Sequence, residues 1–186
     1  MTLREMKMKV LGLIEELNPD SDLLTDDPDI STKINDVINQ VMFEMVRMKK
    51  LPGYVEIPVT EGDLVTFDTI EKYGKYEVYQ IGTVRGVEVD FKAQGTIIKS
   101  KETGTMEIDF FKYPERITDK TKDSYEFELT NDVLEIMPYG IAGDLLKSDI
   151  SSEYGRIYSD RYESLKQMLD PRYQMQSIFI DGGVMI

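Results

Sequence analysis

The side chains best suited to chemistry in this sequence are five aspartates in "NPDSDLLTDDPD", residues 18–29: Asp20, Asp22, Asp26, Asp27 and Asp29. Clustered carboxylates bind Ca²⁺, but this segment lacks the central glycine and distal glutamate of an EF-hand loop. Asp27 directly precedes Pro28, and this order is typical of a helix start. We therefore expect a solvated loop whose carboxylates cap helices, and no metal site.

The sequence contains no cysteine and no histidine. These absences exclude disulfides, thiolate chemistry, the commonest general base and the commonest zinc ligand. No G-x-S-x-G, Walker A or G-x-G-x-x-G motif stands between a strand and a helix. Two carboxylates could hydrolyse a glycoside, but among 35 acidic residues such a pair arises by chance. We expect no catalytic, cofactor-binding or metal-binding residues, and therefore not an enzyme.

Acidic residues outnumber basic ones, 35 to 22, which gives a formal net charge of -13. On average such a chain repels nucleic acid and anionic membranes, with binding through a local basic patch as the alternative. No apolar run approaches the roughly 20 residues that span a bilayer. The N-terminus places basic side chains before an apolar stretch, as a signal peptide does, but Glu5, Glu15 and Glu16 interrupt it and no cleavage site follows. We expect neither a membrane protein nor one exported by an ordinary signal.

Both ends of the chain have helical periodicity. Apolar residues recur every three or four positions from Leu3 to Leu17, after the candidate N-cap Thr2, and again from Ile30 to Met48. Helical spacing returns at Thr130. A last helix is expected to begin at Ser151 or Ser152 and to end at Asp170-Pro171. Its expected inward face consists of Tyr154, Ile157, Tyr158, Tyr162, Leu165 and Met168.

The middle of the chain, residues 54–129, holds β-branched and aromatic residues in short runs separated by glycines. The clearest pair, "GTIIKS" and "TMEIDFF", flanks the turn "KETG", in which Gly104 is placed for a positive φ. Met106, Ile108 and Phe110 alternate with acidic residues, which indicates a half-buried strand. We predict an antiparallel sheet of five to seven strands, with "YEFEL" at residues 125–129 as one of its runs.

These patterns predict an α+β protein: a helical bundle formed by both chain ends, an inserted antiparallel β module and an extended C-terminal arm. The bundle comprises residues 1–52 and 131–170, the β module residues 53–130, and the arm residues 171–186. The arm is apolar and has no element of its own to pack against, so we expect it to dock on a partner by strand addition. A frayed tail without a role is the alternative. The expected interface residues are Arg172, Tyr173, Ile178, Phe179, Ile180, Val184 and Ile186.

The stretch "VLEIMPYGIAGDLLKSD" combines helical spacing with a proline and two glycines. Pro138 cannot donate to the carbonyl of Leu134, so an uninterrupted helix should kink there. Gly140 and Gly143 share a face and let another backbone come close, although each costs up to about 1 kcal/mol relative to alanine. We predict a bent helix packed tightly in the bundle, with tolerated defects as the alternative.

Tyrosines recur every four residues in the last predicted helix, at Tyr154, Tyr158 and Tyr162. We interpret them as core residues whose hydroxyls reach solvent, with an exposed interface stripe as the alternative.

In their order along the chain, four segments resemble the head-to-tail connector proteins of tailed bacteriophages, called adaptor, head-completion or gatekeeper proteins. A strand ending in an aromatic-x-Tyr-Pro step precedes an acidic linker, a Pro-Tyr helix rich in small residues, and a helix spaced by tyrosines. An N-terminal helix, "ISTKINDVINQVMFEM", is also similar to that family's second helix. The chain departs from the pattern at Gly140 and Gly143, where alanine is commoner in the family. The matching residues are Ile34, Asn35, Ile38, Phe111, Tyr113, Pro114, Pro138, Tyr139, Ala142, Leu145, Leu146, Tyr158 and Tyr162.

The resemblance implies a structural virion protein of the neck, assembled in the bacterial cytoplasm. Copies would form a ring, expected to have twelve members, between the portal protein and a tail or second adaptor protein. The arm would reach the portal or a neighbouring copy. Double-stranded DNA would pass through an acidic channel without sequence-specific binding.

Two other classes of function stay open. One is a binding module whose β insertion recognises a carbohydrate or a protein while the helices act as a stalk. The other is a carboxylate enzyme, which requires a pair of acids with raised pKa in a cleft.

Overall fold

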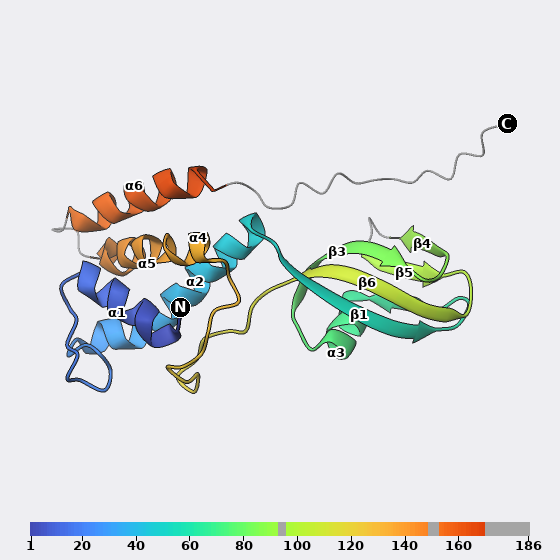
Figure 1. The fold of residues 1–186 in the computed structure, drawn as a ribbon, viewed down its shortest axis with the longest axis horizontal. Helices are drawn as coiled ribbons and strands as arrows, with labels where there is room; N and C mark the ends of the chain where they lie inside the picture. Colours follow the sequence, from blue (N-terminus) through green and yellow to red (C-terminus); the bar gives the residue numbers. More distant parts are fainter. Residues whose placement is uncertain (93–95, 149–152, 170–186) are drawn as a thin grey trace.

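The structure, a computed structural model, describes residues 1–92, 96–148 and 153–169 (Figure 1). It is an α+β protein, as predicted, and within these residues it has two three-stranded antiparallel sheets. We call the group of helices on the left of Figure 1 the helical lobe, and the strands with α3 on the right the β lobe. The elements are α1 (Leu3–Leu13), α2 (Pro28–Met48), β1 (Leu51–Val59), β2 (Leu64–Thr66), α3 (Phe67–Gly74), β3 (Val78–Arg85), β4 (Val89–Lys92), β5 (Ile97–Ser100), β6 (Gly104–Lys112), α4 (Asn131–Leu134), α5 (Met137–Leu145), the 3₁₀ turn Leu146–Ser148 and α6 (Tyr154–Gln167).

The first two helices begin where the sequence predicts. Thr2 caps α1: its hydroxyl accepts from the amide of Glu5, and the Glu5 carboxylate accepts from the amide of Thr2. Asp27 caps α2 by accepting from the amides of Asp29 and Ile30, at 2.8 and 3.2 Å. Each cap satisfies amides that have no partner inside the helix. Both predicted helix starts are confirmed.

One hydrophobic core fills the helical lobe and combines α1, α2, α4, α5 and α6 with the segment that follows β6. Asn39 of α2 pins that segment, because its amide group donates to the carbonyl of Ile117 at 2.7 Å and accepts from the amide of Ile117 at 2.8 Å. Phe127 and Leu129 are buried in the same core. The run at 125–129 is therefore not a strand of the inserted sheet, and residues 117–129 pack with the helices rather than with the β module to which we assigned them.

The strands of the β lobe are divided between sheets ordered β1-β6-β3 and β2-β5-β4 around a second core. The predicted pairing of "GTIIKS" with "TMEIDFF" is wrong, because β5 and β6 lie in different sheets. Gly104 does not have a positive φ; Gly62 and Gly86 do. The lack of a side chain at Gly104 instead makes room for Val87, whose Cγ1 would lie 2.8 Å from an added Cβ. The alternation along β6 is confirmed.

The β lobe also contains a helix that we did not predict. Helix α3 interrupts the segment predicted as strands, and Thr66 caps it with help from Thr69.

Strand β1 lies at a sheet edge, and its prolines, Pro52 and Pro58, are an even number of residues apart. Proline has no amide to donate, so the backbone at both positions must face away from β6, toward the free edge.

The two lobes meet through an aromatic junction. Arg47 of α2 donates to the Tyr113 hydroxyl from Nε at 3.0 Å and from Nη2 at 2.8 Å. The Tyr79 hydroxyl donates to the carbonyl of Val46 at 3.2 Å. The rings of Tyr79 and Tyr113 lie 4.8 Å apart, and those of Phe43 and Tyr113 lie 5.1 Å apart. Side chains from α2, β3 and the end of β6 thus interlock.

Pro138 divides the predicted bent helix into two helices. The chain leaves α4 after Leu134, and α5 begins at Met137 with Pro138 in its first turn. A proline in the first turn costs no hydrogen bond, because amides there have no partner within the helix. The break at residues 135–136 therefore takes the place of a kink.

Candidate functional site on helix α6

Helix α6 lies against α5 along a line of residues with small side chains. An added Cβ at Gly143 would lie 2.6 Å from the hydroxyl and 3.0 Å from the backbone nitrogen of Ser159. At Gly140 it would lie 2.9 Å from the ring of Tyr162, and at Gly155 3.1 Å from Leu146. An added methyl group at Gly140 or Gly143 would force Tyr162 or Ser159 to shift, so glycine favours this close approach of the two helices.

Two tyrosines on the inward face fasten α6 to the first two helices. The Tyr158 hydroxyl donates to the carbonyl of Leu13 at 2.5 Å and so satisfies a carbonyl at the end of α1. The Tyr162 hydroxyl donates to the Glu44 carboxylate of α2 at 3.2 Å. Burial, followed by the charge of Glu44, raises the pKa of Tyr162 well above its ordinary value. Both hydroxyls therefore stay protonated and keep donating at neutral pH.

Lys166 completes the attachment near the end of α6. Its ammonium group lies 2.7 Å from Glu44 and 2.5 Å from Glu163, and its side chain is mostly buried. Burial alone would lower the pKa of Lys166, but the hydrogen bonds to Glu163 and Glu44 outweigh it and raise the pKa. The lysine stays charged and holds α6 to α2.

The outward face of α6 is apolar and carries one cation. Tyr154, Ile157 and Met168 are 63%, 54% and 77% exposed, so our prediction that they face inward is wrong. With Arg161 they follow a spacing of three, four and seven residues, which places them on one side of the helix. Arg161 is exposed and forms no ion pair with any carboxylate that the structure describes. We call these four residues the α6 stripe.

The acidic segment, residues 18–29, forms the connection between α1 and α2. Leu23 is 67% exposed there, whereas the adjacent Leu24 is buried. Asp20, Asp22 and Asp26 are exposed, and within the described ranges none of them pairs with a lysine or an arginine. In the part of the chain that the structure covers, no three carboxylates come together in an arrangement that could hold a metal ion.

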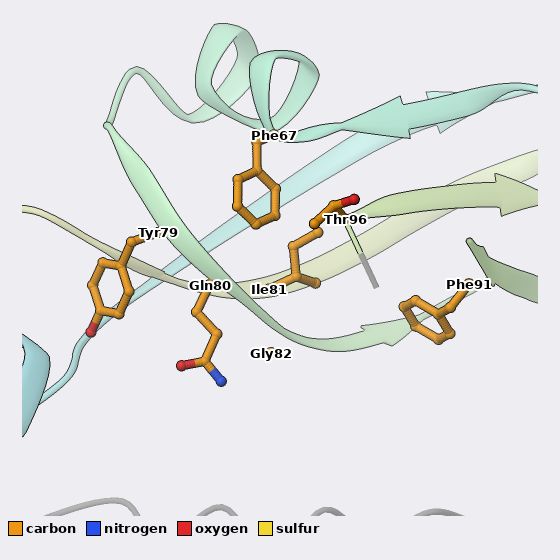
Figure 2. A pocket seen from close by; sticks show the side chains of 7 residues that line it. All are labelled: Phe67, Tyr79, Gln80, Ile81, Gly82, Phe91 and Thr96. Carbon is orange, nitrogen blue, oxygen red and sulfur yellow. The ribbon is translucent and has the colours of Figure 1, made fainter. Parts of the chain in front are cut away.

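The β lobe has a surface hollow of about 400 Å³ between β3, β4 and the start of α3 (Figure 2). Phe67, Ile81 and Phe91 contribute apolar side chains, and Gln80 contributes an amide. Phe91 is 54% exposed. An aromatic surface with one amide suits the apolar face and hydroxyls of a sugar, or an extended peptide.

The predicted site residues fall into two groups. Gly140 and Gly143 of α5 face Tyr162 and Ser159 of α6, whereas Pro138 lies in the first turn of α5 and the Tyr158 hydroxyl reaches the end of α1. The interface residues of the predicted arm lie outside the described residues: Arg172, Tyr173, Ile178, Phe179, Ile180, Val184 and Ile186.

Sequence reasoning missed three residues of α6 and the exposed Leu23. Gly155 and Ser159 face α5, and Arg161 lies in the outward stripe. The spacing of Gly155 and Ser159 was a usable signal, because small residues four apart mark the side on which a helix packs closely.

No family model matches this chain, and a search of curated proteins gave no match. Among the helices that the structure describes, none is long and apolar enough to cross a membrane.

Proposed function

We propose that this protein is a structural, non-enzymatic connector of a tailed-bacteriophage virion. Copies form a ring under the portal and join the DNA-filled head to the tail. The observation that carries the proposal is the α6 stripe, which leaves three large apolar side chains exposed on the outermost helix of the lobe (Figure 1). Contiguous exposed apolar side chains are typical of surfaces that another protein covers.

The position of the stripe also supports assembly. Helix α6 ends at Gln167, three residues short of the C-terminal segment, 171–186, that we assigned to partner binding. Two of the residues that carry the resemblance, Tyr158 and Tyr162, hold α6 in place through their hydroxyls. The pattern shared with connector proteins thus maintains the helix that presents the stripe.

The charge of the chain suits a channel for DNA. Acidic residues outnumber basic ones in residues 1–52, in 53–130 and in 131–186 alike. This excess of acids in every part of the chain favours a channel lining that repels phosphate and lets DNA pass without binding.

The test is the mass distribution of the full chain, alone and mixed with a candidate portal protein, beside a chain truncated after Asp170. We expect rings with the portal that vanish on truncation. Phe91→Asp, a change on the β lobe far from α6, serves as a control that should leave rings intact. A compact monomer or dimer that responds to neither the portal nor the truncation would refute the connector function.

The hollow of the β lobe favours a second candidate, a binding module for a carbohydrate or a protein. Its exposed Phe91 ring can stack on a ligand, and Gln80 can hydrogen-bond to it. A glycan array probed with the full chain and with Phe91→Ala tests this candidate. Binding lost in the variant supports a module, and the absence of binding by the wild type excludes a glycan ligand from that array.

A further inference from the structure

We propose that successive copies of this chain meet head to tail, with the acidic segment of one copy against the α6 stripe of the next. This inference rests on the proposed ring and specifies the two surfaces that close it. The occupant of the stripe is thus a second copy of this chain.

The two surfaces complement each other in charge. The charged residue of the stripe is Arg161, and the acids near it in sequence, Asp160 and Glu163, pair with Arg156 and Lys166 of the same helix. The acidic segment contains neither lysine nor arginine, and no basic residue occurs anywhere from Val10 to Thr32. Opposite charges across an interface select the partner and fix its register, and arginine is the cation that such interfaces favour.

The surfaces also complement each other in shape and apolar character. Leu23 projects from the acidic segment with 67% of its surface exposed and has carboxylates on both sides in sequence. The stripe offers Ile157 and Tyr154 on one side of Arg161 and Met168 on the other. Leu23 and its neighbouring aspartates therefore complement the α6 stripe. In the contact between copies, Leu23 is buried against the apolar residues of the stripe while the aspartates pair with Arg161.

The two surfaces lie at different places on the helical lobe. Leu23 borders a hollow of about 360 Å³ together with Ser31 and Thr32, at the start of α2. Helix α6 instead reaches α2 at Glu44, about 20 Å further along at a rise of 1.5 Å per residue. In Figure 1, α6 runs along the top of the lobe and the blue connection between α1 and α2 lies at its lower left.

A contact between two different patches is heterologous, and its repetition generates a ring if the rotation closes. Leu23 stays 67% exposed in the single copy, so its own α6 stripe does not cover it. A free copy therefore keeps one unfilled surface of each kind, and only a closed ring fills all of them.

The absence of cysteine permits a direct test. The double variant Leu23→Cys with Ile157→Cys contains the only two thiols of the chain. A disulfide forms only where the Cα atoms come within about 7 Å. Under mild oxidation in the presence of the portal, we expect a ladder of linked chains that extends to the ring size and collapses on reduction. Each single cysteine variant should give only chains that are not linked by a disulfide, because the same position in two copies does not meet in a head-to-tail contact.

A matched control pairs Ile157→Cys with Leu64→Cys, since Leu64 is 55% exposed but lies on the β lobe. This pair should give no ladder. A second test reverses charges: Arg161→Glu and Asp22→Lys should each weaken assembly at least tenfold, and the two changes in one chain should restore it.

The outcomes separate this inference from the connector function. If the wild type forms rings on the portal but the double cysteine variant gives no ladder, the head-to-tail contact is refuted and the connector function stands. Dimers from either single variant would also refute it, because they show that like surfaces meet. If the wild type forms no rings at all, the connector function fails and this inference fails with it.

Discussion

The ammonium group of Lys112 lies 2.7 Å from the carboxylate of Glu128 and 3.5 Å from the centre of the Tyr76 ring. Lys112 ends β6, whereas Glu128 belongs to the segment that packs on the helices. The Lys112 side chain is only 7% exposed, and lysines are rarely so buried unless they are paired. The pair therefore links the two lobes through a buried ammonium group and a carboxylate whose side chain is 39% exposed.

Glu128→Gln should lower the free energy of unfolding by about 1–2 kcal/mol, because it leaves a buried ammonium group without a counter-charge. Adding Lys112→Met should recover most of that loss, since apolar replacement of a buried ion pair is often neutral. Urea unfolding of the single and double variants measures both effects. A double variant that is less stable than Glu128→Gln alone would contradict this account.

Gly143→Ala should destabilise the fold by about 1–3 kcal/mol, because the new methyl group meets the backbone of Ser159 and forces α6 away. Gly12→Ala is the matched control. Gly12 also lies in a helix, but an added Cβ there has nothing within 4 Å, so alanine should stabilise by up to about 1 kcal/mol. Thermal unfolding of both variants tests the close approach of α5 and α6, and equal effects would argue against it.

Alkaline pH should weaken the junction between the lobes through Tyr79. Burial, with a smaller contribution from Tyr113, raises the pKa of Tyr79 to about 12. In the unfolded chain a tyrosine loses its proton near pH 10, so between pH 10 and 12 the folded state binds more protons than the unfolded state. Its contribution to stability is complete below pH 10 and is lost as the pH rises through 12.

Urea unfolding at pH 9, 10 and 11 checks this expectation. Stability should fall with pH, and less steeply in Tyr79→Phe, which cannot ionise at that position. If stability falls with pH equally steeply in Tyr79→Phe and in the wild type, Tyr79 has the same pKa in the folded and the unfolded chain, and this expectation is wrong.

Acid should weaken a second buried lysine contact, that of Lys49 with Asp132 at 3.1 Å. The hydrogen bond from Thr130, assisted by Lys49, lowers the pKa of Asp132 below its ordinary value. A carboxylate with a lowered pKa contributes stability above its unfolded pKa of about 4, and that contribution is lost as the pH falls through the folded value. Asp132→Asn should therefore destabilise the protein at pH 7 and make its stability less dependent on pH below 4, as measured by denaturant unfolding at pH 3 to 7.

Features set by neighbours in sequence could be predicted. The caps of Thr2 and Asp27 depend on three or four consecutive residues, and the alternation along β6 depends on local period. Strand pairing could not be predicted in the same way. The runs at β5 and β6 are separated by a short turn typical of a hairpin, yet β5 pairs with β2 and β4 and β6 pairs with β1 and β3, because packing against other strands outweighs the local turn preference.

The candidate site was predictable only in part. Gly140 and Gly143 indicate a close helix contact from the sequence alone, because glycine destabilises a helix and its presence there indicates that a neighbour packs closely. The outward position of Ile157 could not be read from periodicity, since it lies near the boundary of the apolar side of α6, and only the contact with α5 decides which side is covered. The exposure of Leu23 could not be predicted for another reason. A loop has no periodic pattern that separates exposed from buried residues, and the adjacent Leu24 is buried.

The prolines near the two ends of β1 limit the aggregation of this protein at high concentration. With Pro52 and Pro58 facing the free edge, only the short stretch between them can donate amides to an incoming strand. Fibrous aggregation through that edge is thereby suppressed even when many copies of the chain are present at high concentration.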